Sequence, residues 1–93
     1  MQKRLLVLAA GILQVPVIKK AKEKGYYVIA VDGDSNAIGL QYADKAICAN
    51  ITDEEIMLEI AREQHVDGVI HPCSEVSMNV MGRINDELGL AGI

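Results

Sequence analysis

The sequence predicts an α/β fold, a three-layer open parallel sheet with helices on both faces. Two observations carry this prediction. The apolar runs at residues 5–9 and 27–31 lack strict alternation, which is typical of strands covered on both sides. The lysine-rich stretch between them is long enough for the helical crossover that parallel neighbours require. With 93 residues, of which 51% are hydrophobic, the chain supports one domain with one core.

Composition disfavours several classes of function. The net charge of −4 gives no electrostatic attraction to nucleic acid or to anionic membranes, and the chain has three Tyr but no Phe or Trp for stacking on bases. No apolar segment approaches the roughly 20 residues needed to span a bilayer, so we expect a cytoplasmic protein.

Cys48 and Cys73 are isolated in the sequence. We expect both to be free structural thiols, although a disulfide between them remains open.

The first crossover is expected to be a helix from Pro16 to about Lys24. Proline suits the first turn of a helix, where its missing N–H costs nothing, and Gly25 suits a left-handed cap after the last turn. The helical period puts three apolar residues on the inner face: Val17, Ile18 and Ala21. The lysines are interpreted as its solvated outer face rather than as an anion site.

The middle of the chain contains a turn cluster at residues 33–36, a short helix at 37–42 and a brief strand at 45–49, expected at the sheet edge. Thr52 and Glu55 have the spacing of a capping box, which predicts a helix start. The buried stripe of this second helix is expected to consist of Ile56, Met57, Ile60 and Ala61.

The last third continues the pattern. Residues 66–71 are predicted as a strand, with His65 in the connection before it, and Ser74 as the N-cap of a third helix. The apolar residues of that helix recur every four positions: Val76, Val80, Ile84 and Leu88. Residues 90–93 begin a further strand.

Ligands of open parallel sheets bind beyond the carboxyl ends of the strands, where the strand order reverses. Three segments are expected to converge there: residues 10–14, 32–34 and 71–75. A dinucleotide fingerprint would place glycines at positions 9, 11 and 14, and only Gly11 matches. Asp32 follows Gly11 by 21 residues, so it is either a ribose ligand or a turn-forming acid, and the sequence leaves both open.

Two further polar side chains fall in these loops. His71 ends a strand and is interpreted as a hydrogen-bonded structural imidazole, with a general base as the alternative. Glu75 lies in the first turn of the third predicted helix. There it either complements the helix dipole or holds a polar group of a substrate.

These segments together resemble the N-terminal, pre-ATP-grasp domain of ATP-grasp ligases, of the carbamoyl-phosphate-synthase-like or carboxylate–amine ligase type. The resemblance runs through residues 6–11 (LVLAAG), 25–32 (GYYVIAVD), 42–45 (YADK), 66–70 (VDGVI) and 87–92 (ELGLAG). It implies a Rossmann-like sheet of order 3-2-1-4-5, with residues 1–93 forming one domain of a longer chain.

The resemblance also implies a function. In such enzymes ATP activates a carboxylate as an acylphosphate, which an amine then attacks, and the ATP and Mg²⁺ sites lie in grasp domains of the same chain. The N-terminal domain supplies one wall of the substrate crevice. Its contacts would fall on Ile12, Leu13 and Glu75, with Gly11, Asp32 and Ser74 as further substrate-binding residues.

The sequence departs from purine-pathway members of the family, which have a polar residue at the position of Ile12. This departure argues against a ribosyl-phosphate substrate. The fragment alone is expected to bind no cofactor and to have no ligase activity, and homo-oligomerisation remains open. The alternatives are a stand-alone nucleotide-binding or regulatory module and a protein-interaction domain.

Overall fold

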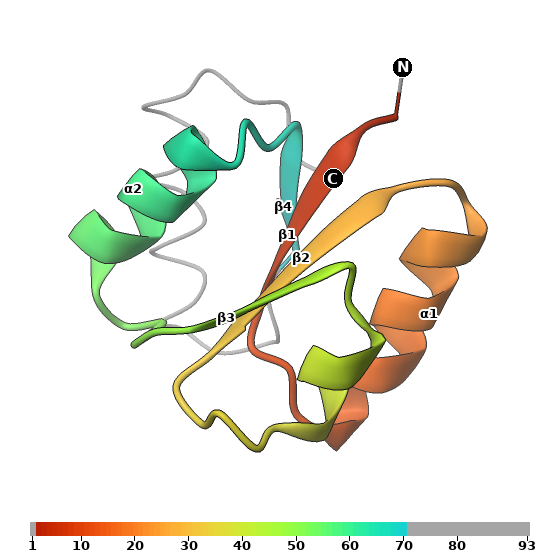
Figure 1. The fold of residues 1–93 in the computed structure, drawn as a ribbon, viewed down its shortest axis with the longest axis horizontal. Coiled ribbons are helices and arrows are strands. Elements are labelled where there is room, and N and C mark those ends of the chain that lie inside the picture. Colours follow the sequence, from red (N-terminus) through yellow and green to blue (C-terminus); the bar gives the residue numbers. More distant parts are fainter. Residues whose placement is uncertain (1, 71–93) are drawn as a thin grey trace.

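The computed structural model describes residues 2–70 and confirms the α/β fold (Figure 1). Its elements are β1 (Arg4–Leu8), the 3-10 helix η1 (Ile12–Gln14), α1 (Val15–Glu23), β2 (Tyr27–Asp32), the 3-10 helix η2 (Ile38–Tyr42), β3 (Lys45–Cys48), α2 (Glu54–Glu63) and β4 (Gly68–Ile70). The predicted helix after Ser74 and the predicted strand at 90–93 lie outside the described residues.

The four strands form one sheet in the order β3-β2-β1-β4, and every pairing is parallel. Leu6 of β1 sits in register between Ile29 of β2 and Val69 of β4. The order agrees with the first four strands of the expected arrangement, and β3 lies at the edge as predicted. The first strand therefore occupies the interior of the sheet, with neighbours on both sides.

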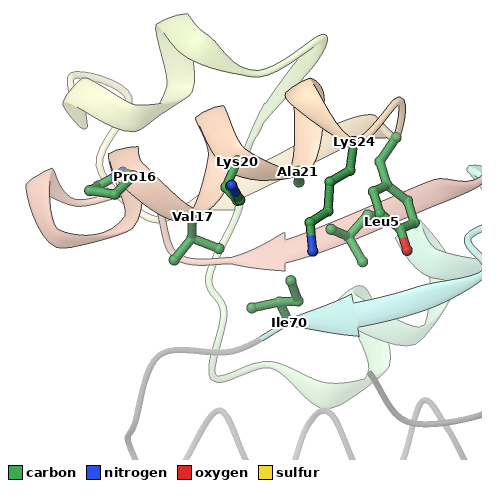
Figure 2. Close-up of a pocket in the computed structure, with 8 residues that line it drawn as sticks. Leu5, Pro16, Val17, Lys20, Ala21, Lys24 and Ile70 are labelled. Atoms are coloured by element: carbon green, nitrogen blue, oxygen red, sulfur yellow. The ribbon is translucent and has the colours of Figure 1, made fainter.

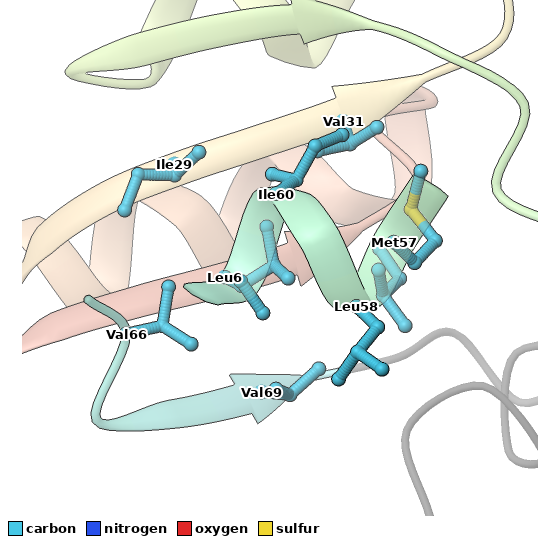
Figure 3. Close-up of a cluster of buried hydrophobic side chains, with 10 residues drawn as sticks. Leu6, Ile29, Val31, Met57, Leu58, Ile60, Val66 and Val69 are labelled. Carbon is cyan, nitrogen blue, oxygen red and sulfur yellow. The ribbon is translucent and has the colours of Figure 1, made fainter. Parts of the chain in front are cut away.

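Alternate residues of the strands contribute to two hydrophobic clusters, one on each face of the sheet. Figure 1 shows α1 and α2 on opposite sides of the sheet. Leu6 and Leu8 point toward α2, whereas Leu5 and Val7 point toward α1 and η2. Figure 3 shows the α2 cluster. Its buried members are Leu6, Leu8, Ile29, Val31, Met57, Leu58, Ile60, Ala61, Val66 and Val69.

The helix α1 follows the prediction. Proline occupies its first turn, its buried residues are Ile18 and Ala21, and its lysines are exposed. Val17, the third residue predicted for the inner face, is only partly buried. Gly25 has a φ of +90°, the left-handed conformation expected of the residue that ends the helix.

Two predictions for α2 were wrong in detail. Ile56 is 39% exposed, while Leu58 is buried: the two lie about 100° from Met57 in opposite directions around the helix axis, and the buried face extends toward Leu58. The N-cap is Asp53, whose carboxylate accepts the backbone N–H of Ile56 at 3.2 Å. The Thr52 hydroxyl instead donates to Oδ1 of Asn50 at 2.7 Å. Threonine and aspartate are both good N-caps, so local preference did not decide between neighbours.

Candidate functional site

The strand order reverses at β1, because β2 lies on one side of it and β4 on the other. The carboxyl end of β1 is therefore the expected position of a ligand crevice. Residues 9–14, which connect β1 to α1, lie at that end of the strand. His71, Ser74 and Glu75, the other residues predicted for this crevice, lie outside the described residues.

The β1–α1 loop begins with an unusual backbone conformation. Ala9 has a φ of 87°, in a region that glycine adopts readily and other residues rarely do. Its N–H donates to the Val31 carbonyl at 2.7 Å, which continues the β1–β2 pairing one residue beyond the strand. Position 9 is the first glycine position of the dinucleotide fingerprint. Alanine therefore adopts a glycine-like φ that residue matching alone missed.

Asp32 fixes the next residue of the loop. Its Oδ2 accepts the N–H of Ala10 at 2.8 Å, and its Oδ1 accepts the N–H of Asp34 at 2.8 Å. These contacts support the turn interpretation of Asp32. Each carboxylate oxygen keeps a second lone pair, so a contact to substrate stays a prediction.

Gly39 holds the same loop from the other side, and the sequence analysis missed it. Its N–H donates to the Ala10 carbonyl at 2.7 Å. A Cβ at this position would lie 2.5 Å from that oxygen, so only glycine fits without movement of the backbone. Glycine in a turn-rich segment was visible in the sequence, but its contact with Ala10 was not.

The tip of the loop carries two exposed apolar side chains. Ile12 is 70% exposed and Leu13 is 84% exposed, and both belong to the 3-10 helix η1. Gly11 is in ordinary extended conformation with φ −67° and ψ 177°, and a Cβ there would meet nothing within 4 Å. The fold itself thus places no demand on Gly11, and the expectation that it admits a ligand to the backbone stays a prediction.

A separate groove of about 500 Å³ lies between α1 and β4 on the face of the sheet (Figure 2). Leu5 and Ile70 come from the strands, Val17 and Ala21 from α1, and Lys20 and Lys24 are the charged residues of its lining. The remaining lining residues are Pro16 and Tyr26. The groove does not include residues 9–14 of the loop.

Other candidate chemistry in the described part of the chain is limited. The Cys48 thiol is free and exposed, 3.6 Å from the Gly33 carbonyl, while Cys73 lies outside the described residues. Within residues 2–70, no group of three or more His, Cys, Asp or Glu side chains is placed to hold a metal ion. No helix in that range is long and apolar enough to cross a membrane.

No protein-family model matches the sequence. The formate-dependent phosphoribosylglycinamide formyltransferase of Prochlorococcus marinus subsp. pastoris is 31% identical over 85 residues, which are 91% of this chain and 22% of that enzyme. Among solved structures, phosphoribosylglycinamide synthetase from Anaerococcus prevotii superposes with a TM-score of 0.87 at 30% identity, over 98% of this chain and 23% of that one.

The relatives of this chain are ATP-grasp ligases, and the similarity fits their N-terminal, pre-ATP-grasp domain. This confirms the resemblance drawn from the sequence. The N5-carboxyaminoimidazole synthetase from Staphylococcus aureus, solved as a complex with ADP, has the same fold, with a TM-score of 0.80 at 15% identity, covering 99% of this chain and 24% of that one. The chain spans about a fifth of the length of the curated relatives that it matches, 22% of the formyltransferase.

Proposed function

We propose that the chain is the N-terminal, substrate-side domain of an ATP-dependent carboxylate–amine ligase of the carbamoyl-phosphate-synthase-like type. The observation that carries the proposal is the similarity to such an enzyme over 91% of the chain. The reversal of strand order at β1 supports it, since ligands of open parallel sheets bind at such reversals, and the loop that the family resemblance assigns to substrate follows β1.

In this proposal the domain binds substrate and performs no chemical step. Gly11, Ile12 and Leu13 contact the substrate from the β1–α1 loop, with Asp32 beside them. Ser74 and Glu75 contact it from the segment after β4. ATP and Mg²⁺ bind in the grasp domains of the same polypeptide, which are also the partners of this domain.

The alternative is a stand-alone nucleotide-binding module, and the geometry of the loop disfavours it. Pyrophosphate in such modules lies on the N–H groups that begin the first helix. Here Pro16 removes one of those N–H groups, and the N–H of Val15 donates to the Ile12 carbonyl. The beginning of α1 therefore offers few donors to a nucleotide.

Calorimetric titration of the 93-residue chain separates the two functions. We expect no micromolar binding of NAD, NADP or AMP, and no hydrolysis of ATP in the presence of Mg²⁺ and a carboxylate. Micromolar binding of any of these nucleotides would favour the module, and ATP hydrolysis would show that the domain assignment is wrong.

Sequencing the gene beyond codon 93 gives an independent test. The expected result is a downstream sequence that contains a glycine-rich hairpin and Glu and Asn metal ligands.

A further inference from the structure

We infer that the β1–α1 loop binds a hydrocarbon part of the substrate and no phosphate, with Ile12 and Leu13 as the residues that determine this specificity. The inference rests on the proposed function, because it names the substrate group for the same crevice. Three observations carry it: the hydrogen bonds already made by the loop, the distribution of charge over the sheet, and the exposure of the two side chains.

The backbone donors of the loop are largely used by the protein itself. The N–H groups of Ala9 and Ala10 donate to the Val31 carbonyl and to the Asp32 carboxylate, respectively. The N–H groups of Gln14 and Val15 donate to the carbonyls of Gly11 and Ile12. A phosphate bound here would find backbone donors only at Gly11, Ile12 and Leu13, at the start of a 3-10 helix that is three residues long.

The charges at this end of the sheet oppose an anion. Asp32 ends β2, Asp34 follows it, and Asp53 lies just before α2, so carboxylates gather near the carboxyl ends of the strands. Among the described residues, the segments 5–18, 25–44 and 46–61 contain no Lys, Arg or His. A phosphate dianion at this edge would therefore meet like charge without a compensating cation from these three described segments.

The side chains at the tip suit an apolar group instead. Ile12 and Leu13 are the two most exposed large hydrophobic residues of the described chain, at 70% and 84%. Their backbone is held by contacts to β2 and η2 through Ala9 and Ala10, so the loop is shaped before ligand binds. Covering these side chains with hydrocarbon removes apolar surface from water, whereas hydrating a phosphate beside them gains nothing.

This specificity differs from that of the formyltransferase and synthetase above, whose names include a phosphoribosyl compound. The family resemblance implies a polar residue at the position of Ile12 in purine-pathway members. An aliphatic side chain at the tip of the loop can contact a hydrocarbon group of a substrate, but it cannot accept a hydrogen bond from an amine or a hydroxyl.

The test uses amide chemical shifts of the 93-residue chain, titrated with three probes: 3-methylbutylamine, methylamine and ribose 5-phosphate. We expect 3-methylbutylamine to shift the resonances of residues 11–14 with a dissociation constant at least about tenfold below those of the other two probes. The double variant Ile12→Ser, Leu13→Ser should lose this preference. The matched control Ile56→Ser, which changes an exposed isoleucine on α2, should keep it.

Three results would overturn the inference: no shift with 3-methylbutylamine, equal binding of methylamine, or equal or tighter binding of ribose 5-phosphate. Circular dichroism of the double variant confirms that it is folded, so loss of binding is not mistaken for loss of structure. None of these probes is a nucleotide, so a failure here leaves the calorimetric test of the proposed function unaffected.

Discussion

The sheet has an amino edge, where its parallel strands begin, and a carboxyl edge, where they end. At both, an aspartate accepts a backbone N–H beyond the regular strand pairing, but the surrounding side chains differ. At the amino edge Asp67 accepts the N–H of Arg4 and Asp44 accepts that of Val28, each at 2.8 Å. The Arg4 guanidinium also covers the ring of Tyr27, 4.3 Å from its centroid. At the carboxyl edge Asp32 accepts the N–H of Ala10 at 2.8 Å.

The two edges differ in what their side chains contact. Long polar side chains at the amino edge bind to the protein itself, as Arg4 does with Gln64. The carboxyl edge fixes its loop through the backbone and the short Asp32 side chain, and it leaves Ile12 and Leu13 exposed. Exposed apolar side chains on a fixed loop are typical of a binding surface rather than of a structural edge.

The largest effect is expected at Gly39. Gly39→Ala would place a Cβ 2.5 Å from the Ala10 carbonyl oxygen, and the displaced backbone should lower the free energy of unfolding by about 3 kcal/mol. Gly11→Ala is the matched control, since a Cβ there meets nothing within 4 Å. It should change stability by less than about 1 kcal/mol. Urea denaturation measures both, and equal losses would show that Gly39 does not hold the loop.

The two edges should respond differently to loss of their aspartates. Asp32→Ala leaves two N–H groups without an acceptor, of which that of Ala10 is partly buried, and should cost about 2 kcal/mol. Asp67→Ala leaves one such group, in an exposed position, and should cost about 1 kcal/mol. The same denaturation experiment compares them, and a smaller loss for Asp32→Ala would reverse the ranking of the two edges.

A gain in stability is expected at the start of the loop. Ala9→Gly relieves the positive φ of 87°, an advantage of about 1 to 2 kcal/mol that the greater freedom of glycine in the unfolded chain partly offsets. The net increase in unfolding free energy should be up to about 1 kcal/mol. Thermal unfolding followed by circular dichroism gives the sign, and a lower midpoint for the variant would contradict the strained conformation.

The smallest effect is expected at the tip. Replacing Ile12 and Leu13 by serine should change the free energy of unfolding by less than about 0.5 kcal/mol, because both side chains are already largely in water. A loss well above that value would mean that the pair packs against the rest of the domain. In that case the carboxyl edge would resemble the amino edge after all.

The sequence alone predicted the elements of this fold well where the signal is local. The position of proline and glycine at the ends of α1, the short helix near Leu40 and the edge strand β3 all follow from turn residues and apolar runs. Local residue preference gave the wrong N-cap for α2, because two neighbouring residues are both suited to that position. Thr52 and Asp53 both cap helices well, and the structure uses Asp53.

The sequence by itself determined that β1 organises the chain and that Gly11, Ile12, Leu13 and Asp32 follow strand ends. Only the tertiary structure decided what these residues do. Asp32 bonds to a residue 22 positions away, Gly39 fits against Ala10, and Ala9 takes a positive φ. Periodicity and turn preference act between neighbours in sequence, whereas these contacts depend on the register of β1 against β2, which the burial of two sheet faces sets.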